Sequence, residues 1–407
     1  MRWGQAIGLT LLVTAEAACQ TFGWRHGGLA LVSILYILLG LSVGLYGLLP
    51  QSKPLASRSF RLPAFVLLAV IIAGALWRTP VIIQNWGFDY KIADMLPILQ
   101  VMGERFWAGS PVYAEIPEIW GGMYPIYLPA MWMPYLPAIG IGIDLRWANT
   151  LFFLIAVCLV AWPGRRWKAQ GLLLFLPLML LAYFVFVHYT SLIGISEESV
   201  VLLWYTLLGW SLLRRRPAWI GLAAALCLLS RYALAFWLLA WGLYQLSCKR
   251  RQLVSRVTVA ALAAGIFLMG AGQAFPEIPE FLSLPGKYLA ELSDPAKEWS
   301  ITQTVHRNLG LAKFVPYGHL PLLHRSLMPV SLLLPLGLFA ARWRWPEAFS
   351  RTGLFELAVL KLSMLVFFNL LPTAYSYLFY TSTLLSLLLL RACLLPPIRS
   401  SIDPAHS

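Results

Sequence analysis

The sequence has few charged residues and few cysteines. Asp, Glu, Lys and Arg make up only 12% of its 407 residues, whereas hydrophobic residues make up 59%. This composition lies well outside the range of soluble proteins and leaves no segment long enough for a soluble domain. The cysteines lie inside or at the ends of apolar runs, at Cys19, Cys158, Cys227, Cys248 and Cys393. Their spacing predicts neither a disulfide framework nor a metal site.

Apolar runs occupy most of the chain, without an internal repeat, a low-complexity tract or a strand pattern. The runs have about 15 to 22 residues, enough to cross or nearly cross the roughly 30 Å hydrocarbon core of a bilayer. We therefore expect an all-α polytopic membrane protein, a bundle of about 11–13 transmembrane helices. The expected spans are 4–23, 28–49, 63–84, 146–163, 170–189, 199–213, 218–229, 232–247, 257–274, 327–341, 354–371 and 374–392.

The net charge of +14 is unevenly distributed among the connectors. Basic residues concentrate in the short connectors, at 53–61, 164–168, 214–217, 248–256 and 341–351. The long connector 85–127 has two basic and five acidic residues, and 275–325 has five of each. By the positive-inside rule the short connectors face the cytoplasm. We therefore expect a protein of the cytoplasmic membrane with a cytoplasmic N-terminus, and the basic residues indicate no nucleic-acid partner.

Two segments must be irregular for this topology to close. Residues 128–143 are short and contain three prolines, so we expect them to be re-entrant or interfacial. Both ends of 217–247 are basic, so this run is expected to form two short helices that meet near Ser230 and Arg231. The polar segments then converge on the extracytoplasmic face: 85–127, 190–198, 230–232, 275–325 and 372–377.

Asp89 stands where the third apolar run ends, in the stretch NWGFDYKIADML. Aromatic neighbours on both sides exclude part of the solvent, and partial desolvation suits a carboxylate to general-base work. The same position also suits the N-cap of an interfacial helix. Asp94, five residues later, has the pattern of a solvated or helix-capping residue.

The segment after Asp89 carries an ordered set of residues: Asp89, Tyr90, Ala93, Gly109, Pro111, Tyr113, Tyr124, Pro125 and Pro129. In this order and spacing the segment from Phe88 to Pro137 resembles the first outer loop of GT-C membrane glycosyltransferases, in particular glycosyltransferase family 87. Members of that group use polyprenol-phosphate mannose. The sequence departs from the family at Ile126, where a second proline is typical. It departs again at Tyr375 and Tyr377, where several members have a Trp/His pattern.

The resemblance implies a GT-C-like helical bundle and an inverting transfer of mannose or another hexose. The donor would be a polyprenyl-phosphate sugar, and the acceptor a lipid-linked or extracytoplasmic glycan. Asp89 would be the general base that deprotonates the acceptor hydroxyl. No cofactor or metal is implied, because no carboxylate forms an Asp-x-Asp pair with Asp89.

Arg231 is the candidate for the donor phosphate. An arginine within an otherwise uncharged run is costly unless it meets an anion or a cavity. The alternatives are that Arg231 snorkels or pairs with Glu197 or Glu198. These glutamates would bind sugar hydroxyls, or would cap the helix that begins near Val200.

Further candidate substrate-binding residues lie in the same outer segments. They are Tyr90, Lys91, Tyr113, Tyr124, Gln303, His306, Arg307, Asn308, Tyr375 and Tyr377. Solvent exposure is the alternative for His306, and the tyrosines are also typical interface anchors. His319 and His324 are expected to be interfacial.

We divide the chain into an accessory pair of N-terminal helices (1–62), a catalytic membrane module (63–395) and a cytoplasmic tail (396–407). The first helix is expected to be retained, although its start resembles a signal peptide. The N-terminal pair could dock a protein partner, in addition to membrane lipids. Glu16, Glu356 and Lys361 are intramembrane charges without a functional interpretation. The alternative functions are a lipid or glycolipid transporter or flippase, and a non-catalytic assembly subunit derived from a GT-C enzyme.

Overall fold

The protein is a helical bundle in the computed structural model, which describes residues 3–25, 30–50, 62–119, 121–161, 169–306, 309–372 and 376–395. Among these residues, helices and one isolated bridge make up the regular structure. Seven helices of the described chain are long and apolar enough to cross a membrane, and three shorter apolar helices accompany them. The expectation of an all-α polytopic membrane protein is therefore confirmed.

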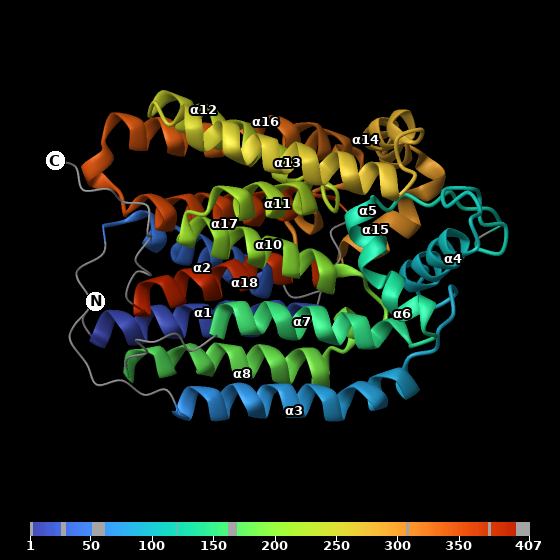
Figure 1. The fold of residues 1–407 in the computed structure, drawn as a ribbon, viewed down its shortest axis with the longest axis horizontal. Helices are drawn as coiled ribbons and strands as arrows, with labels where there is room; N and C mark the ends of the chain where they lie inside the picture. Colours follow the sequence, from blue (N-terminus) through green and yellow to red (C-terminus); the bar gives the residue numbers. More distant parts are fainter. Residues whose placement is uncertain are drawn as a thin grey trace.

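The lengthwise helices correspond to the expected spans, although α13 and α16 begin six and seven residues earlier than expected. They are α1 (Trp3–Arg25), α2 (Ala30–Leu48), α3 (Leu62–Asn85), α7 (Leu145–Ala161), α8 (Phe175–Tyr183), α10 (Glu198–Arg214), α11 (Pro217–Leu228), α12 (Leu234–Ser247), α13 (Arg251–Ala271), α16 (Leu320–Arg344), α17 (Thr352–Leu370) and α18 (Tyr380–Leu394). Short helical turns, η2 (Ala169–Leu174) and η3 (Phe184–His188), extend α8 at both ends. In Figure 1 these helices lie side by side along the long axis of the molecule.

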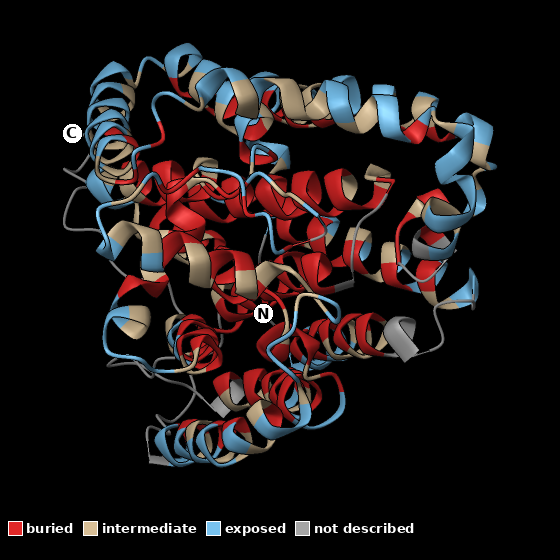
Figure 2. Ribbon diagram, turned by 90° about the vertical axis from the view of Figure 1, so that its right-hand side faces the viewer, coloured by how far each residue is buried: buried red, intermediate tan, exposed pale blue. Residues whose placement is uncertain are grey.

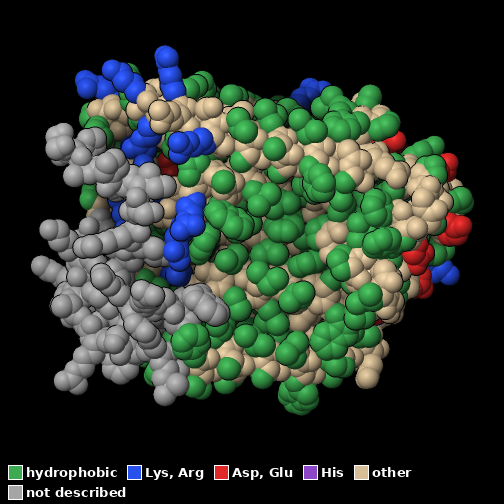
Figure 3. Space-filling model, in the orientation of Figure 1, with side chains coloured by type: hydrophobic (Ala, Val, Ile, Leu, Met, Phe, Trp, Pro, Cys, Tyr) green, Lys and Arg blue, Asp and Glu red, His purple; other side chains and the backbone are tan. Residues whose placement is uncertain are grey.

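Short helices gather at one end of this bundle (Figure 1). They are α4 (Met95–Trp107), α5 (Pro129–Trp132), α6 (Leu136–Gly140), α14 (Ile278–Leu292) and α15 (Glu298–His306). Figure 3 shows Asp and Glu at this end, Lys and Arg mainly at the opposite end, and a hydrophobic surface between them. We call the two ends the acidic end and the basic end. An apolar band between two polar ends is the surface that a bilayer requires.

The two irregular segments are present where the sequence predicted them. Residues 129–140 break into α5, the turn η1 (Met133–Tyr135) and α6, each with a proline in its first two positions. Proline lacks a backbone donor and blocks continuation of the preceding turn, so this segment does not form one spanning helix. The run 217–247 is likewise divided into α11 and α12, with a break at 229–233.

The interior of the bundle is built around α17 and α18. Their spanning windows are 83% and 100% buried within the protein, whereas that of α13 is 11% buried. Figure 2 shows the same distribution, with buried residues in the middle and exposed ones at the periphery. Small residues allow the central helices to approach closely: a Cβ at Gly209 would lie 2.8 Å from the Leu388 side chain of α18.

The N-terminal helix pair packs directly against this centre. Lys361 of α17 forms an ion pair with Glu16 of α1 and a hydrogen bond with Ser382 of α18, and the charged pair is fully buried. Thr383 Oγ1 donates to Gln20 Oε1 at 2.7 Å beside it. The partner that the sequence could not assign to Lys361 is thus Glu16. That the two N-terminal helices dock a protein partner stays a prediction.

Loss of one partner of the Glu16–Lys361 pair should destabilise the protein strongly. Lys361→Met leaves a carboxylate buried without its counter-charge, which typically costs about 3–5 kcal/mol. The double variant Glu16→Met with Lys361→Met should recover most of that loss, because the interior then holds no unpaired charge. Titration of the purified variants with sodium dodecyl sulfate in mixed micelles measures the unfolding free energies. Additive losses in the double variant would contradict the coupling.

Candidate functional site

Arg231 lies in the break between α11 and α12, two helices of fewer residues than a bilayer crossing needs. The twelve residues of α11 rise about 18 Å at 1.5 Å per residue, whereas a bilayer core is about 30 Å thick. A chain that enters at the basic end therefore reaches the break before it reaches the other surface. An ionisable side chain at such a depth is a functional-site candidate.

Two glutamates at the start of α10 surround the Arg231 guanidinium. Nη2 of Arg231 donates to Glu197 Oε1 at 3.0 Å and also to Glu198 Oε1. Glu197 is 2% exposed and Glu198 is fully buried, whereas the Arg231 side chain is 30% exposed. We call these three residues the Arg231 cluster. The pairing that the sequence left open as an alternative for Arg231 is present, and involves both glutamates.

Side chains hydrogen-bonded to the backbone of the connector before α10 hold the two glutamates in place. Asn149 Nδ2 donates to the carbonyls of Ile193 and Ser196 at 3.0 and 2.8 Å. Tyr135 in turn donates to Asn149 Oδ1 at 2.6 Å. The Ser196 hydroxyl accepts from the Glu198 amide at 3.0 Å, so a serine rather than a carboxylate meets this helix start. Both glutamates are thus free to face Arg231 instead of capping α10.

Several polar atoms of the cluster have no hydrogen-bond partner. Nε of Arg231 is buried without an acceptor, and the second carboxylate oxygens of Glu197 and Glu198 are buried without a donor. The buried hydroxyl of Tyr205, which interacts electrostatically with Arg231 and Glu198, also has none. Buried polar atoms in native proteins are nearly always satisfied. The arrangement therefore fits a ligand that brings both acceptors and hydroxyl donors.

Burial also changes the proton affinity of the cluster. Desolvation raises the pKa of Glu197 to about 7, a shift that Arg231 opposes and the nearby Glu198 and Asp94 carboxylates increase. Burial therefore favours the neutral form of this carboxyl group more than water does, while Arg231 favours the charged form. A buried carboxyl group with a pKa near 7 beside a charge partner is typical of sites that bind or transfer protons.

The first outer segment covers the cluster from the acidic end. The Ala130 amide of α5 donates to the Leu229 carbonyl at 3.2 Å, and Trp204 Nε1 of α10 donates to the Ala130 carbonyl at 2.9 Å. These bonds attach the proline-rich segment to the α11–α12 break. Tyr127, just before α5, is buried beside the cluster, and desolvation together with Glu197 raises its pKa well above the usual value.

Asp89 and Asp94 occupy different positions in this segment. Asp89 is exposed in the turn between α3 and α4, where its Oδ1 accepts from the Lys91 amide at 2.9 Å. Asp94 is half-buried, is the N-cap residue of α4 without a side-chain cap bond, and interacts electrostatically with Glu197 and Tyr127. Asp94 is therefore the first-loop carboxylate with a described electrostatic link to the cluster. The sequence favoured Asp89 because of its aromatic neighbours and its place in the family-like loop. The expected partial desolvation of Asp89 is wrong, because the turn before α4 leaves this residue exposed.

The remaining predicted residues are distributed over the acidic end. Tyr113 is buried and donates to the Tyr127 carbonyl at 3.0 Å, and Tyr377 donates to Met95 Sδ at 3.2 Å, next to Asp94. Tyr90 is half-buried, whereas Lys91, Tyr124 and Gln303 are exposed. The His306 side chain, Arg307, Asn308 and Tyr375 lie outside the described residues. The structure thus brings Glu197, Glu198 and Arg231 together, and adds Tyr127, Tyr205 and Asp94, which the sequence did not select.

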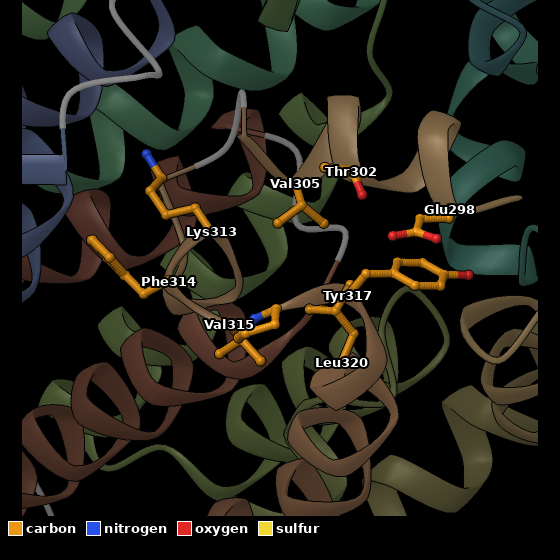
Figure 4. A pocket seen from close by; sticks show the side chains of 9 residues that line it. Glu298, Thr302, Val305, Lys313, Phe314, Val315, Tyr317 and Leu320 are labelled. Atoms are coloured by element: carbon orange, nitrogen blue, oxygen red, sulfur yellow. The ribbon is translucent and has the colours of Figure 1, made fainter. Parts of the chain in front are cut away.

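The outer segment 275–325 forms a small cap with its own hydrophobic core of Leu292, Val305, Ala312 and Leu320. A cavity of about 350 Å³ lies on this cap, lined by Glu298, Thr302, Val305, Lys313, Phe314, Val315, Pro316, Tyr317 and Leu320. Figure 4 shows Lys313 and Phe314 on one side and Glu298, Thr302 and Tyr317 on the other. Burial lowers the pKa of the Lys313 amine to about 8. The volume of this cavity and its mixture of polar and apolar lining residues are those of a small-molecule subsite.

No group of three or more His, Cys, Asp or Glu side chains that could hold a metal ion occurs among the described residues. Comparisons with known protein families, with curated proteins and with solved structures found no match to this chain. The chemistry of the site therefore has to be argued from its own residues.

The pH dependence of stability should change when Glu197 is replaced. Between its ordinary value of 4.5 and about 7 the folded protein binds the Glu197 proton more tightly than the unfolded chain does. The contribution of this group to the unfolding free energy therefore falls as the pH rises through that window. Above the window the contribution is constant. Glu197→Gln should flatten the fall in Tm across the same window, as measured by thermal unfolding in detergent.

The exposed Glu118, in the segment 85–127, provides the matched control, because Glu118→Gln removes a carboxylate that is not buried. Its pH profile should follow that of the wild type. Parallel profiles for wild type and Glu197→Gln would show that the Glu197 proton is not held in the folded state.

Proposed function

We propose that the protein is an integral-membrane inverting glycosyltransferase that moves a hexose from a polyprenyl-phosphate donor to a lipid-linked or extracytoplasmic glycan acceptor. The Arg231 cluster binds the sugar phosphate of the donor. A carboxylate of the first outer loop is the general base. The resemblance of that loop to family 87 assigns this role to Asp89, and the position of Asp94 makes it the second candidate.

The observation that carries this proposal is the set of unsatisfied atoms in the Arg231 cluster. A buried donor, Nε of Arg231, suits a phosphate oxygen, because guanidinium–phosphate hydrogen bonds are charge-assisted. The second oxygens of Glu197 and Glu198 suit sugar hydroxyls, which donate hydrogen bonds to carboxylates. A sugar phosphate offers both kinds of group within one ligand.

The depth of the cluster supports a lipid-borne donor. Arg231 is partly exposed at an interrupted helix, whereas its glutamate partners are buried. A polyprenyl chain in the bilayer would hold its phosphate near this level, with the sugar toward the acidic end. Such positioning brings the anomeric carbon and the acceptor together, which lowers the entropic barrier to transfer.

One direct displacement accounts for the chemistry. The acceptor hydroxyl oxygen forms a bond to the anomeric carbon as the bond from that carbon to the phosphate oxygen breaks. The proton of the hydroxyl passes to the first-loop carboxylate, and the phosphate leaves with the electron pair of the broken bond. Arg231 stabilises the charge that develops on the leaving group. The configuration at the anomeric carbon is inverted, because the nucleophile enters opposite the leaving group.

The cavity on the 275–325 cap supports an acceptor site on the same side of the membrane. The Thr302 hydroxyl and the Glu298 carboxylate in its lining suit a polyhydroxylated ligand. Tyr317 offers an aromatic ring for stacking. The cap and the first outer segment lie at the same end of the bundle (Figure 1). Donor and acceptor would thus meet at the acidic end.

Transfer should depend on Arg231 and on one of the two first-loop aspartates. In nanodiscs supplied with radiolabelled polyprenyl-phosphate mannose or glucose and a membrane-lipid extract, Asp89→Asn should lower the transfer rate by about 10²–10⁴-fold with donor binding retained. Asp94→Asn makes the same chemical change at the second candidate base, and Glu118→Gln is the control for loss of an exposed carboxylate. A large rate loss in Asp94→Asn alone would instead assign the base to Asp94.

Arg231→Gln should weaken donor binding by about tenfold or more, which is the contribution of a charge-assisted hydrogen bond. The exposed Arg251 provides the control for removal of one positive charge. Donor binding that is unchanged in Arg231→Gln would contradict the phosphate assignment. Absence of both binding and transfer for every donor tested would favour the transporter or assembly-subunit alternatives.

The proposal also requires that the acidic end faces the outside of the cell. The exposed positions Glu118 and Arg251 report on the two ends. Glu118→Cys should react with a membrane-impermeant maleimide on intact cells, whereas Arg251→Cys should react only after permeabilisation, as the positive-inside rule predicts. The reverse pattern would place the site on the cytoplasmic side and exclude extracytoplasmic transfer.

A further inference from the structure

Arg391, in the last turn of α18, is a buried cation without a described counter-charge. The residue is 6% exposed, and its Nε is buried with no hydrogen-bond partner. The described residue that acts electrostatically on it is another arginine, Arg214. A guanidinium has five donors and does not lose its proton in proteins, so a buried Nε without an acceptor leaves part of the desolvation cost uncompensated.

Arg214 is in the same situation at the neighbouring helix end. It is the last residue of α10, its Nε is also buried without a partner, and Arg216 repels it further. Its guanidinium carbon lies 4.8 Å from the ring centroid of Trp210, a contact that supplies no counter-ion. The α10 and α18 helices are in close contact one turn earlier, where Gly209 meets Leu388.

Other buried or partly buried cations of the described chain have partners, which makes this pair different. Lys361 pairs with Glu16, Arg146 with Asp144, and Arg231 with Glu197 and Glu198. Arg342, also at the basic end, donates to the Tyr244 hydroxyl at 2.9 Å and to the Ser350 carbonyl. The chain therefore satisfies its cations in general, and the pair Arg214–Arg391 is an exception among the residues described.

The helix ends explain only part of this arrangement. Cations are favoured near helix C-termini, because the last carbonyls carry partial negative charge. That effect is small at exposed positions, and it neither supplies an acceptor for the two buried Nε atoms nor removes the repulsion between the two guanidiniums. An anion between the two side chains would offset both the repulsion and the desolvation.

We propose that Arg214 and Arg391 form a binding site for a phosphate group at the basic end of the molecule. Two guanidiniums match the oxygens of a phosphate with several charge-assisted hydrogen bonds. Basic sites between helix ends on the cytoplasmic side are where anionic lipid headgroups bind. A phospholipid headgroup and a soluble phosphate share this chemistry, and the experiment below separates them. The site lies at the opposite end from the Arg231 cluster and does not depend on sugar transfer.

The test measures the Tm of the full-length protein in nanodiscs of digalactosyldiacylglycerol alone, a lipid without phosphate, in nanodiscs that also contain phosphatidylglycerol, and in the galactolipid with inorganic phosphate at matched ionic strength. The wild type should be stabilised by the anion in at least one of these. Stabilisation by phosphatidylglycerol alone identifies a lipid headgroup, and stabilisation by inorganic phosphate identifies a soluble anion.

Arg391→Gln should abolish this response and weaken binding of the effective anion by about tenfold or more. In the galactolipid alone the same variant should melt at a higher temperature than the wild type, because an uncompensated charge is gone. Arg214→Gln, at a half-buried position, gives an independent test if Arg391→Gln does not fold. The exposed Arg344 supplies the control, since Arg344→Gln removes one charge from the same end.

Three results would overturn the proposal. The wild type could respond to neither anion. The response could persist in both Arg391→Gln and Arg214→Gln. Finally, Arg344→Gln could lose the response to the same extent as the other two variants. The response would then come from the general positive charge of the basic end.

Discussion

The cost of placing charge in a low-dielectric interior governs this structure. Most of the surface between the two ends is apolar, so a charged side chain at that depth needs a partner within the protein. Glu16 and Lys361 meet this requirement in the centre of the bundle, where neither is exposed. That ion pair joins α1 to α17, and so makes the two N-terminal helices part of the same packed unit.

The Arg231 cluster meets the requirement only in part, and that incompleteness is the basis of the functional proposal. Two carboxylates form ion pairs with one guanidinium, yet a donor and two acceptors stay buried without partners. The Glu16–Lys361 pair leaves one carboxylate oxygen without a partner, whereas the Arg231 cluster leaves a guanidinium donor, two carboxylate oxygens and the Tyr205 hydroxyl. It is this combination of a donor with several acceptors that suits a ligand. The break between α11 and α12 brings Arg231 to this depth, and α5 covers it. Interrupted helices are where membrane proteins place polar ligands.

Much of the fold could be predicted from the sequence, because hydrophobic length and proline position are local properties. The spans, the interrupted segment 128–143 and the break near Arg231 all follow from runs of adjacent residues. Contacts between distant segments could not be predicted in the same way. Glu16 and Lys361 are 345 residues apart, and no local pattern pairs them. The helices α14 and α15 were also not foreseen, since they lie in polar segments without the length of a span.

In the candidate site, too, local features could be predicted from the sequence and contacts between distant segments could not. Pairing of Arg231 with Glu197 or Glu198 was one of the alternatives, because a lone intramembrane arginine suggests an anion nearby. The contribution of Tyr127 and Tyr205 depends on how α5 and α10 meet, which spacing does not reveal. The difference between Asp89 and Asp94 depends on where α4 begins. Both residues suited a helix start in the sequence, but only Asp94 is the residue immediately before α4.

A structure of the protein with a non-transferable polyprenyl-phosphonate sugar, determined by electron cryomicroscopy in nanodiscs, would test the central claim most directly. The account predicts the phosphonate beside Nε of Arg231 and the sugar hydroxyls beside Glu197 and Glu198, with a first-loop aspartate facing the anomeric carbon. A ligand bound elsewhere, with the Arg231 cluster unchanged and its free atoms satisfied by water, would contradict it.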